Sequence, residues 1–219
     1  MDDSDSRPDV SQYRPGAELV GGGNEVVQGD AGIGSVFLGP YECCISGALL
    51  ELQNNGVGGI VNCTADYECV HEGVLEYSRV PVHDLPQEDI LRYLEGAARF
   101  VERHVSSGRS VLVHCEMGRS RSSTVVIAYL MRFGGLSRDD AYVHIKTRRF
   151  SVSPNQGFWR QLNRFELQVR SMGEADMVTQ VFDRDWAAKS HAMFGTSVTF
   201  LCPRARTLLS WSRPLWKLL

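Results

Sequence analysis

The stretch His114–Ser122, HCEMGRSRS, brings several side chains capable of chemistry into one short segment. It follows an apolar run, Ser110–Val113, that predicts a buried strand, and it leads into a helical pattern over Ser122–Phe133. A strand that passes through a short loop into a helix directs backbone N–H groups and the positive end of the helix dipole toward one point. Gly118 allows a tight turn, and the planar guanidinium of Arg121 can donate bidentate hydrogen bonds to phosphate oxygens. The segment therefore predicts an anion-binding loop.

Cys115 lies at the base of this loop, where the field that attracts phosphate also favours a thiolate. Attack of the sulfur on phosphorus would form a cysteinyl-phosphate and divide a difficult hydrolysis into two easier steps. An acid must protonate the leaving oxygen, and the same group, now a base, must activate the water of the second step. Ser122 can hydrogen-bond the sulfur and improve it as a leaving group. The cysteinyl-phosphate mechanism requires no metal or other cofactor. The alternative interpretation of Cys115 is a buried core cysteine without a catalytic role.

The pattern Cys115, five residues, Arg121 and Ser122 resembles the signature of the protein tyrosine phosphatases, and VHCEMGRSRSSTVVIAYLM resembles their dual-specificity branch. Three other stretches support the resemblance. SRVPVHD is similar to the general-acid loop, SRDDAYVHIKTRRFSVSPNQGFWRQL to the C-terminal helical pair, and IGSVFLGPYECCISGALLELQNNGVGGIVNCT to the first strand, helix and second strand. The resemblance covers nearly all of Ile33 to Ser171 and neither end of the chain.

The resemblance implies a role for each matching residue. The family would make Cys115 the nucleophile, Arg121 the clamp on phosphate and transition state, Asp84 the acid and base, Ser122 the helper of the second step, and His114 the residue that holds the loop and tunes the thiol. The remaining residues of the phosphate-binding loop are Glu116, Met117, Gly118, Arg119 and Ser120.

The assignment of the acid has competitors in the sequence. Asp84 can alternatively cap a helix that begins near LPQEDI, and Glu88 or Asp89 can take its place as the acid. Asp84 is favoured because it stands in the stretch that resembles the general-acid loop.

Two features bear on the substrate. The domain is expected to begin close to its first strand, which leaves little room for the extra loop that deepens the pocket of phosphotyrosine-only relatives. A shallow pocket would admit phosphoserine and phosphothreonine as well as phosphotyrosine. Glu116 disfavours phosphoinositides, because its carboxylate would repel a polyanionic headgroup at a position where relatives acting on those lipids tend to carry lysines.

Basic residues and a second cysteine lie near the predicted site. Arg119 and the pair Arg148 and Arg149 can grip a second phosphate at the rim, or they can equally be solvated surface arginines. Cys63 follows the second predicted strand, where a cysteine of this superfamily can form a reversible disulfide with the nucleophile. A buried strand cysteine is the favoured reading of Cys63.

The resemblance implies a dual-specificity protein phosphatase that hydrolyses phosphotyrosine and phosphoserine or phosphothreonine in phosphorylated proteins, with MAP kinases as a family-level expectation. One rival is a phosphoprotein-binding pseudophosphatase, although such proteins usually lack the cysteine, the arginine or the acid, and all three are present. Another is a lipid or RNA phosphatase on the same fold. The expected location is the cytoplasm, and also the nucleus.

The surrounding elements predict an α/β domain, and the resemblance implies the phosphatase fold, with a central mixed sheet flanked by helices. Helical spacing over Glu88–Val105 predicts an amphipathic helix, and further helices are expected over Ser122–Phe133, Ser137–Thr147 and Pro154 to about Ser171, with Ser137 as a cap. We expect the domain to cover residues 33–171 and residues 1–32, rich in Asp, Ser, Pro and Gly, to be a flexible tail. Residues 172–219 form an extension without a predicted structure.

Composition excludes several classes. A net charge of −3 and a pI of about 6.1 argue against a nucleic-acid binder. The acidic start is unlike a signal peptide, the longest apolar run, Thr124–Met131, is too short to cross a bilayer, and the six cysteines suggest neither a zinc site nor a disulfide framework. The basic stretch FLCPRARTLLSWSRPLWKLL is compatible with a membrane surface or a partner, but packing on its own domain or disorder is favoured.

Overall fold

The computed structural model describes residues 18–29 and 31–172 of the chain. The chain divides into two compact units, residues 1–166 and 167–219, and the described part of the second unit is the helical segment 167–172. The predicted extension over 172–219 therefore lies, apart from residue 172, outside the described residues. Among the described helices, none is long and apolar enough to cross a membrane.

A six-stranded mixed sheet forms the centre of the first unit, which confirms the expected fold class. Its strand order is β1-β2-β3-β6-β4-β5, in which the last four are parallel and the first two pair antiparallel. The strands are β1 (Glu18–Leu19), β2 (Gly23–Val27), β3 (Val36–Gly39), β4 (Val57–Asn62), β5 (Glu76–Arg79) and β6 (Ser110–His114). Strand β6 is buried at every position because it lies between β3 and β4.

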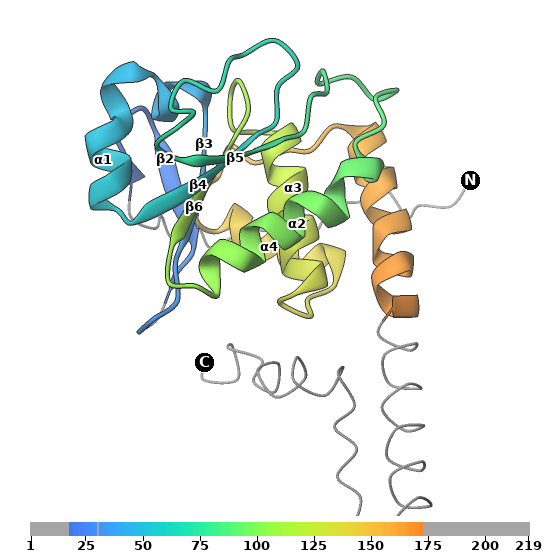
Figure 1. The fold of residues 1–219 in the computed structure, drawn as a ribbon. Coiled ribbons are helices and arrows are strands. Elements are labelled where there is room, and N and C mark those ends of the chain that lie inside the picture. Colours follow the sequence, from blue (N-terminus) through green and yellow to red (C-terminus); the bar gives the residue numbers. More distant parts are fainter. Residues whose placement is uncertain (1–17, 30, 173–219) are drawn as a thin grey trace, which may run out of the picture. The chain divides into compact units, whose positions relative to one another are not determined.

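Helices cover both faces of this sheet (Figure 1). One face packs against α1 (Leu49–Asn54) in a core that includes Phe37, Ile60 and Leu112. Since successive side chains of a strand point to opposite faces, the neighbouring residues of β3, β4 and β6 face the other side. There the sheet meets α2, α3 and α4, drawn in green and yellow in Figure 1.

The predicted helices are confirmed with small changes at their ends. They are α2 (Leu91–Val105), α3 (Arg121–Arg132), α4 (Arg138–Lys146) and a last helix over residues 156–172, and short 3-10 turns cover Tyr41–Cys44 and Ser46–Ala48. Ser137 caps α4 as expected, since its Oγ accepts a hydrogen bond of 3.1 Å from the N–H of Asp140. Helix α2 begins three residues later than the periodicity predicted, because residues 85–90 form a turn region.

The prediction that residues 1–32 form a flexible tail is wrong for residues 18–27. These residues form the hairpin of β1 and β2, and β2 adds to the edge of β3 with Asn24 opposite Leu38. The glycine run, whose composition is typical of a linker, forms the turn of the hairpin. Gly21 and Gly22 adopt φ values of +82° and +85°, a backbone conformation that favours glycine. The sheet therefore begins before the predicted boundary at residue 33, and residues 1–17 and 30 lie outside the described part.

Replacement of Val26 tests whether this hairpin contributes to stability. Val26 is fully buried in β2, so we expect Val26→Ala to lower the free energy of unfolding by about 2 kcal/mol in urea denaturation. Val20 lies in the turn of the same hairpin and is 76% exposed, so Val20→Ala should change stability by less than about 0.5 kcal/mol. Equal, negligible effects of both changes would contradict the packed hairpin.

Candidate active site

The predicted anion-binding loop lies where β6 ends, at His114, and α3 begins, at Arg121. The carboxyl ends of β3 and β4 flank this point because all three strands run parallel. In open sheets of this kind ligands bind beyond the carboxyl ends of the strands. The N–H of Tyr41, just after β3, donates to the carbonyl oxygen of Glu116 at 3.1 Å and attaches the loop to its neighbour.

Gly118 is the residue that allows the loop to pack on the end of β3. Its φ is +62°, and a Cβ at this position would lie 2.5 Å from the carbonyl carbon of Gly39. Any other residue would be strained in its backbone and would also collide with β3. The shape of the loop therefore depends on glycine here, as the sequence predicts.

The first turn of α3 keeps its backbone donors available. Ser120 stands at the N-cap of the helix, but its side chain makes no capping hydrogen bond. Its hydroxyl instead donates a hydrogen bond of 2.6 Å to Oδ1 of Asp84. Because the usual cap is engaged elsewhere, the N–H groups at this end of the helix can bind an anion.

Cys115 is buried at the base of the loop, with only 2% of its surface exposed. The Oγ of Ser122 donates a hydrogen bond of 3.2 Å to its Sγ. The structure thus brings together the predicted nucleophile and the predicted helper of the second step. A hydroxyl that donates to sulfur stabilises the thiolate form.

Arg121 is buried beside the loop and is only partly satisfied by protein groups. Its side chain is 8% exposed, its Nη1 donates to the carbonyl of Val82 at 3.4 Å, and its Nη2 contacts Oε2 of Glu116 at 3.2 Å. Within the described residues its Nε has no hydrogen-bond partner. A buried guanidinium with an unused donor is suited to bind a phosphate oxygen.

Asp84 is joined directly to the phosphate-binding loop, which supports its assignment over its competitors. Its Oδ1 accepts hydrogen bonds from Ser120 and, at 2.7 Å, from Nδ2 of Asn155. In the described part of the chain neither Glu88 nor Asp89 makes a side-chain hydrogen bond to the loop. Asp84 also caps no helix, since α2 begins at Leu91 after a residue without a side-chain cap.

Asn155 is a site residue that the sequence did not identify. Its N–H donates to Oγ of Ser120 at 3.0 Å, and its Oδ1 accepts from the N–H of Phe158 at 2.9 Å and so caps the last helix. It therefore connects that helix to both Ser120 and Asp84. The only signal in the sequence was its place in the stretch that resembles the C-terminal helical pair, and that resemblance gave no role to this side chain.

His114 is buried at the end of β6, and burial lowers its pKa to about 4. Its Nδ1 lies 3.4 Å from the carbonyl oxygen of Cys115, and its role in holding the loop stays a prediction. At neutral pH the imidazole is uncharged. It therefore adds no positive charge beside the thiol.

The arginines of the predicted second-phosphate rim are engaged with protein groups. Nε of Arg119 donates to the carbonyl of Ser151 at 3.3 Å, and the guanidinium of Arg148 lies against the ring of His144. Arg149 makes several such contacts: it donates to carbonyl oxygens of the phosphate-binding loop and to residues 22 and 24. It therefore contacts the loop itself, and a contact of Arg119, Arg148 or Arg149 with a second phosphate stays a prediction.

Cys63 lies directly after β4 and next to the loop, because its N–H donates to the carbonyl of His114 at 2.8 Å. It is fully buried and free, and burial raises its pKa well above the usual range, with the charge of the Cys115 thiolate adding to the effect. The favoured reading as a buried strand cysteine agrees with this position. A disulfide with Cys115 stays a prediction.

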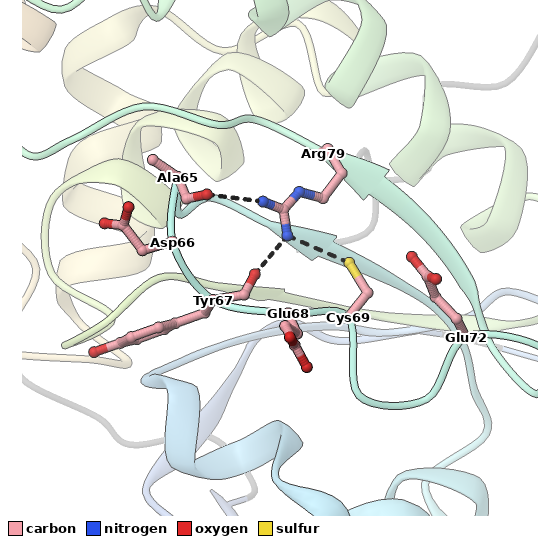
Figure 2. A pocket seen from close by; sticks show the side chains of 7 residues that line it. All are labelled: Ala65, Asp66, Tyr67, Glu68, Cys69, Glu72 and Arg79. Atoms are coloured by element: carbon pink, nitrogen blue, oxygen red, sulfur yellow. Dashed lines mark hydrogen bonds between the residues drawn. The ribbon is translucent and has the colours of Figure 1, made fainter.

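An open cavity of about 520 Å³ lies on the loop between β4 and β5 (Figure 2). Figure 2 shows the guanidinium of Arg79 reaching the carbonyl oxygens of Ala65 and Tyr67 and the sulfur of Cys69, which holds this loop together. Carboxylates dominate the remaining lining, namely those of Asp66, Glu68 and Glu72.

This cavity adjoins the general-acid loop. Asp66 lies 3.6 Å from Nδ1 of His83, the neighbour of Asp84, and the ring of Tyr67 lies against that of Tyr41, tilted by 40°, with centroids 4.3 Å apart. The lining of this cavity therefore carries three carboxylates beside the one guanidinium of Arg79. Within residues 18–29 and 31–172, no group of three or more His, Cys, Asp or Glu side chains is placed to hold a metal ion.

The strand-loop-helix that carries Cys115 and Arg121 agrees with the predicted resemblance to the protein tyrosine phosphatase superfamily. The family profile "Dual specificity phosphatase, catalytic domain" matches residues 36–168, and the chain therefore belongs to the dual-specificity phosphatase family. The hairpin of β1 and β2 lies outside the matched residues.

Individual relatives agree with this assignment. Human dual specificity phosphatase 28 is 40% identical over 139 residues, covering 63% of this chain and 78% of the relative. Its crystal structure has a TM-score of 0.59 at 38% identity, with 62% of this chain and 90% of that chain covered. A mouse dual specificity phosphatase solved with zinc tungstate has a TM-score of 0.60 at 37% identity, with 63% and 86% covered.

Other relatives are much longer than the shared region. Human Slingshot homolog 2 is 40% identical over 118 residues, which are 54% of this chain but 8% of that protein. The match covers 12% of Drosophila melanogaster Slingshot and 55% of human dual specificity phosphatase 2. The similarity therefore concerns the catalytic domain.

The lowered pKa of His114 predicts acid sensitivity. Between about pH 6.5 and pH 4 the unfolded chain binds a proton at this histidine and the folded chain does not, so the free energy of unfolding falls as the pH falls. From pH 7 to pH 4.5 the loss should be about 2 to 3 kcal/mol larger in the unmodified protein than in His114→Asn, measured by urea denaturation. Burial also lowers the pKa values of His104 and His144, but these residues are present in both proteins. Equal losses in the two proteins would contradict the assignment.

The contact between Glu116 and Arg121 predicts that the loop carries its own competitor for an anion. A tetrahedral dianion such as tungstate must displace the carboxylate from Nη2, so we expect Glu116→Gln to bind tungstate about fivefold more tightly by calorimetry, and less so at high salt. Glu68→Gln removes a charge nearby without touching Arg121 and serves as the control. If the tungstate affinity of both variants rises equally, the cause is the loss of one negative charge near the site and not the release of Arg121 from Glu116.

Proposed function

We propose that the protein is a cysteine-dependent phosphatase of phosphorylated proteins. The observation that carries the proposal is the hydrogen bond from Ser122 to the Cys115 sulfur inside a loop whose arginine, Arg121, has an unused buried donor. The thiolate attacks phosphorus, an S–P bond forms, and the bond from phosphorus to the leaving oxygen breaks. Arg121 and the N–H groups of the loop stabilise the charge on the three equatorial oxygens.

Asp84 supplies the proton in this scheme. In the first step its carboxyl group gives a proton to the leaving oxygen, and in the second it takes a proton from the water that attacks the cysteinyl-phosphate. The S–P bond then breaks, and the sulfur leaves as a thiolate that receives the hydrogen bond of Ser122. The hydrogen bonds from Ser120 and Asn155 to one oxygen of Asp84 orient the carboxyl group beside the loop.

The substrate class follows from family and charge. Because its family acts on phosphoproteins, we propose phosphotyrosine and phosphoserine or phosphothreonine as the targets, with MAP kinases as the first to test on family grounds. Glu116 beside the nucleophile and the acidic flank of Asp66, Glu68 and Glu72 both repel a polyanionic lipid headgroup. Protein substrates are therefore favoured over phosphoinositides.

Hydrolysis of aryl phosphates in the presence of EDTA tests the mechanism. We expect Cys115→Ser to abolish turnover, and Asp84→Asn to lower kcat by roughly 10²- to 10⁴-fold. The loss in Asp84→Asn should be larger for phenyl phosphate than for p-nitrophenyl phosphate, since phenolate needs the proton more. Asp89→Asn is the matched control and should retain activity. A loss of equal size with both leaving groups would mean that Asp84 positions the substrate and donates no proton.

The same assay separates a catalyst from a binding module. A binding role has to be tested because one similar solved structure is of a human protein named for an interaction, the tyrosine phosphatase-like serine/threonine/tyrosine-interacting protein. It has a TM-score of 0.58 at 33% identity, with 60% of this chain and 91% of that chain covered. In the present chain Glu116 occupies Arg121, which would weaken substrate binding. Tight phosphopeptide binding without turnover by the unmodified chain would replace the enzyme assignment with a binding role.

A further inference from the structure

Arg149 lies behind the phosphate-binding loop and holds two of its carbonyl groups. Its Nε donates to the carbonyl oxygen of Gly118 at 3.0 Å, and its Nη2 donates to that of Met117 at 3.2 Å. A guanidinium can do this because its donors lie in one plane and in a fixed fork. A lysine ammonium in the same place could not span both oxygens with the same geometry.

The orientation of these carbonyls determines where the loop presents its N–H groups. In a trans peptide unit the C=O and the following N–H point in opposite directions. When Arg149 binds the oxygens of Met117 and Gly118, the N–H groups of Gly118 and Arg119 are turned away from Arg149, toward the opposite side of the loop. Preorganised N–H groups of this kind hold an anion without first having to reorient.

The other side of the same guanidinium holds the N-terminal hairpin. Nη1 donates to Oδ1 of Asn24 at 2.7 Å and to the carbonyl oxygen of Gly22 in the hairpin turn. Asn24 is itself fixed, since it is 6% exposed and its Nδ2 donates to Glu18 at 3.0 Å. Arg149 thus connects the loop to a hairpin more than 100 residues away in the sequence.

The hairpin and the loop also meet through β3. Asn24 pairs with Leu38, and the next residue, Gly39, is the one on which Gly118 packs. A Cβ on Gly39 would in turn lie 2.9 Å from Cα of Gly23. The hairpin, the end of β3 and the phosphate-binding loop are therefore stacked in close contact, and Arg149 spans the outer two.

We propose that Arg149 is a positioning residue for the phosphate-binding loop and that the β1-β2 hairpin, which lies outside the family match, is part of the apparatus that holds this loop in its anion-binding shape. The kinetic test of this role rests on the proposed phosphatase activity, whereas the tungstate-binding test does not.

Tungstate binding to the full chain tests the proposal independently of turnover. We expect Arg149→Lys, which keeps the charge but loses the fork, to weaken tungstate binding roughly 10- to 100-fold by calorimetry, and kcat/KM for p-nitrophenyl phosphate by a similar factor. Asn24→Ala removes only a hairpin contact and should weaken both by a smaller factor. All measurements are made well below the melting temperature of each variant.

Arg109→Lys is the matched control, because Arg109 binds Glu76 and Ser107 at the opposite end of β6. It should leave tungstate affinity unchanged. If Arg149→Lys lowers the melting temperature but leaves tungstate affinity at the level of Arg109→Lys, its role is merely structural and the proposal is wrong. If Arg149→Lys weakens binding and Asn24→Ala does not, the hairpin has no part in holding the loop.

The two proposals fail in different ways. An unmodified chain that binds tungstate but turns over no phosphate ester would remove the enzyme assignment and leave the binding series intact. If the unmodified chain hydrolyses phosphate esters and Arg149→Lys binds tungstate with unchanged affinity, the enzyme assignment stands and the proposed role of Arg149 is wrong.

Discussion

The loop after Cys115 has to keep backbone N–H groups open for an anion, and the remainder of the structure depends on this constraint. Such groups are stable in a protein only when an anion or another acceptor is close, or when the surrounding structure holds them. Here the central strand β6, the close packing of Gly118 on Gly39 and the buried guanidinium of Arg121 supply that support. The neutral state of His114 keeps the positive charge at the site on Arg121 and the helix end.

Much of this site could be predicted from the sequence because it is local. Cys115, Gly118, Arg121 and Ser122 lie within one strand-loop-helix, where spacing determines geometry. The four parallel strands and the long helices also followed from apolar periodicity, whereas the antiparallel strands that make the sheet mixed did not. Asp84 came from the resemblance alone, and the structure then attached it to the loop through Ser120.

The parts that sequence analysis missed depend on contacts between distant residues. Asn155 reaches Asp84 across 71 residues, and Arg149 reaches Asn24 across 125, so no local pattern marks either side chain. The hairpin was missed for a different reason. Its glycines have the composition of a linker, and only the positive φ values and the pairing of β2 with β3 distinguish a tight turn from a flexible segment.

The contacts of Ser120 and of the last helix have a consequence for the way in which Asp84 is held. Its hydroxyl binds Asp84 and accepts from Asn155, Gly157 has no space for a Cβ against the carbonyl of Pro86, and Gln161 donates to the carbonyl of Glu88 at 2.8 Å. The acid-bearing segment is thus attached both to the loop and to the last helix. A change in that helix would therefore reach Asp84 through Asn155, and the segment that follows Asp84 through Gln161.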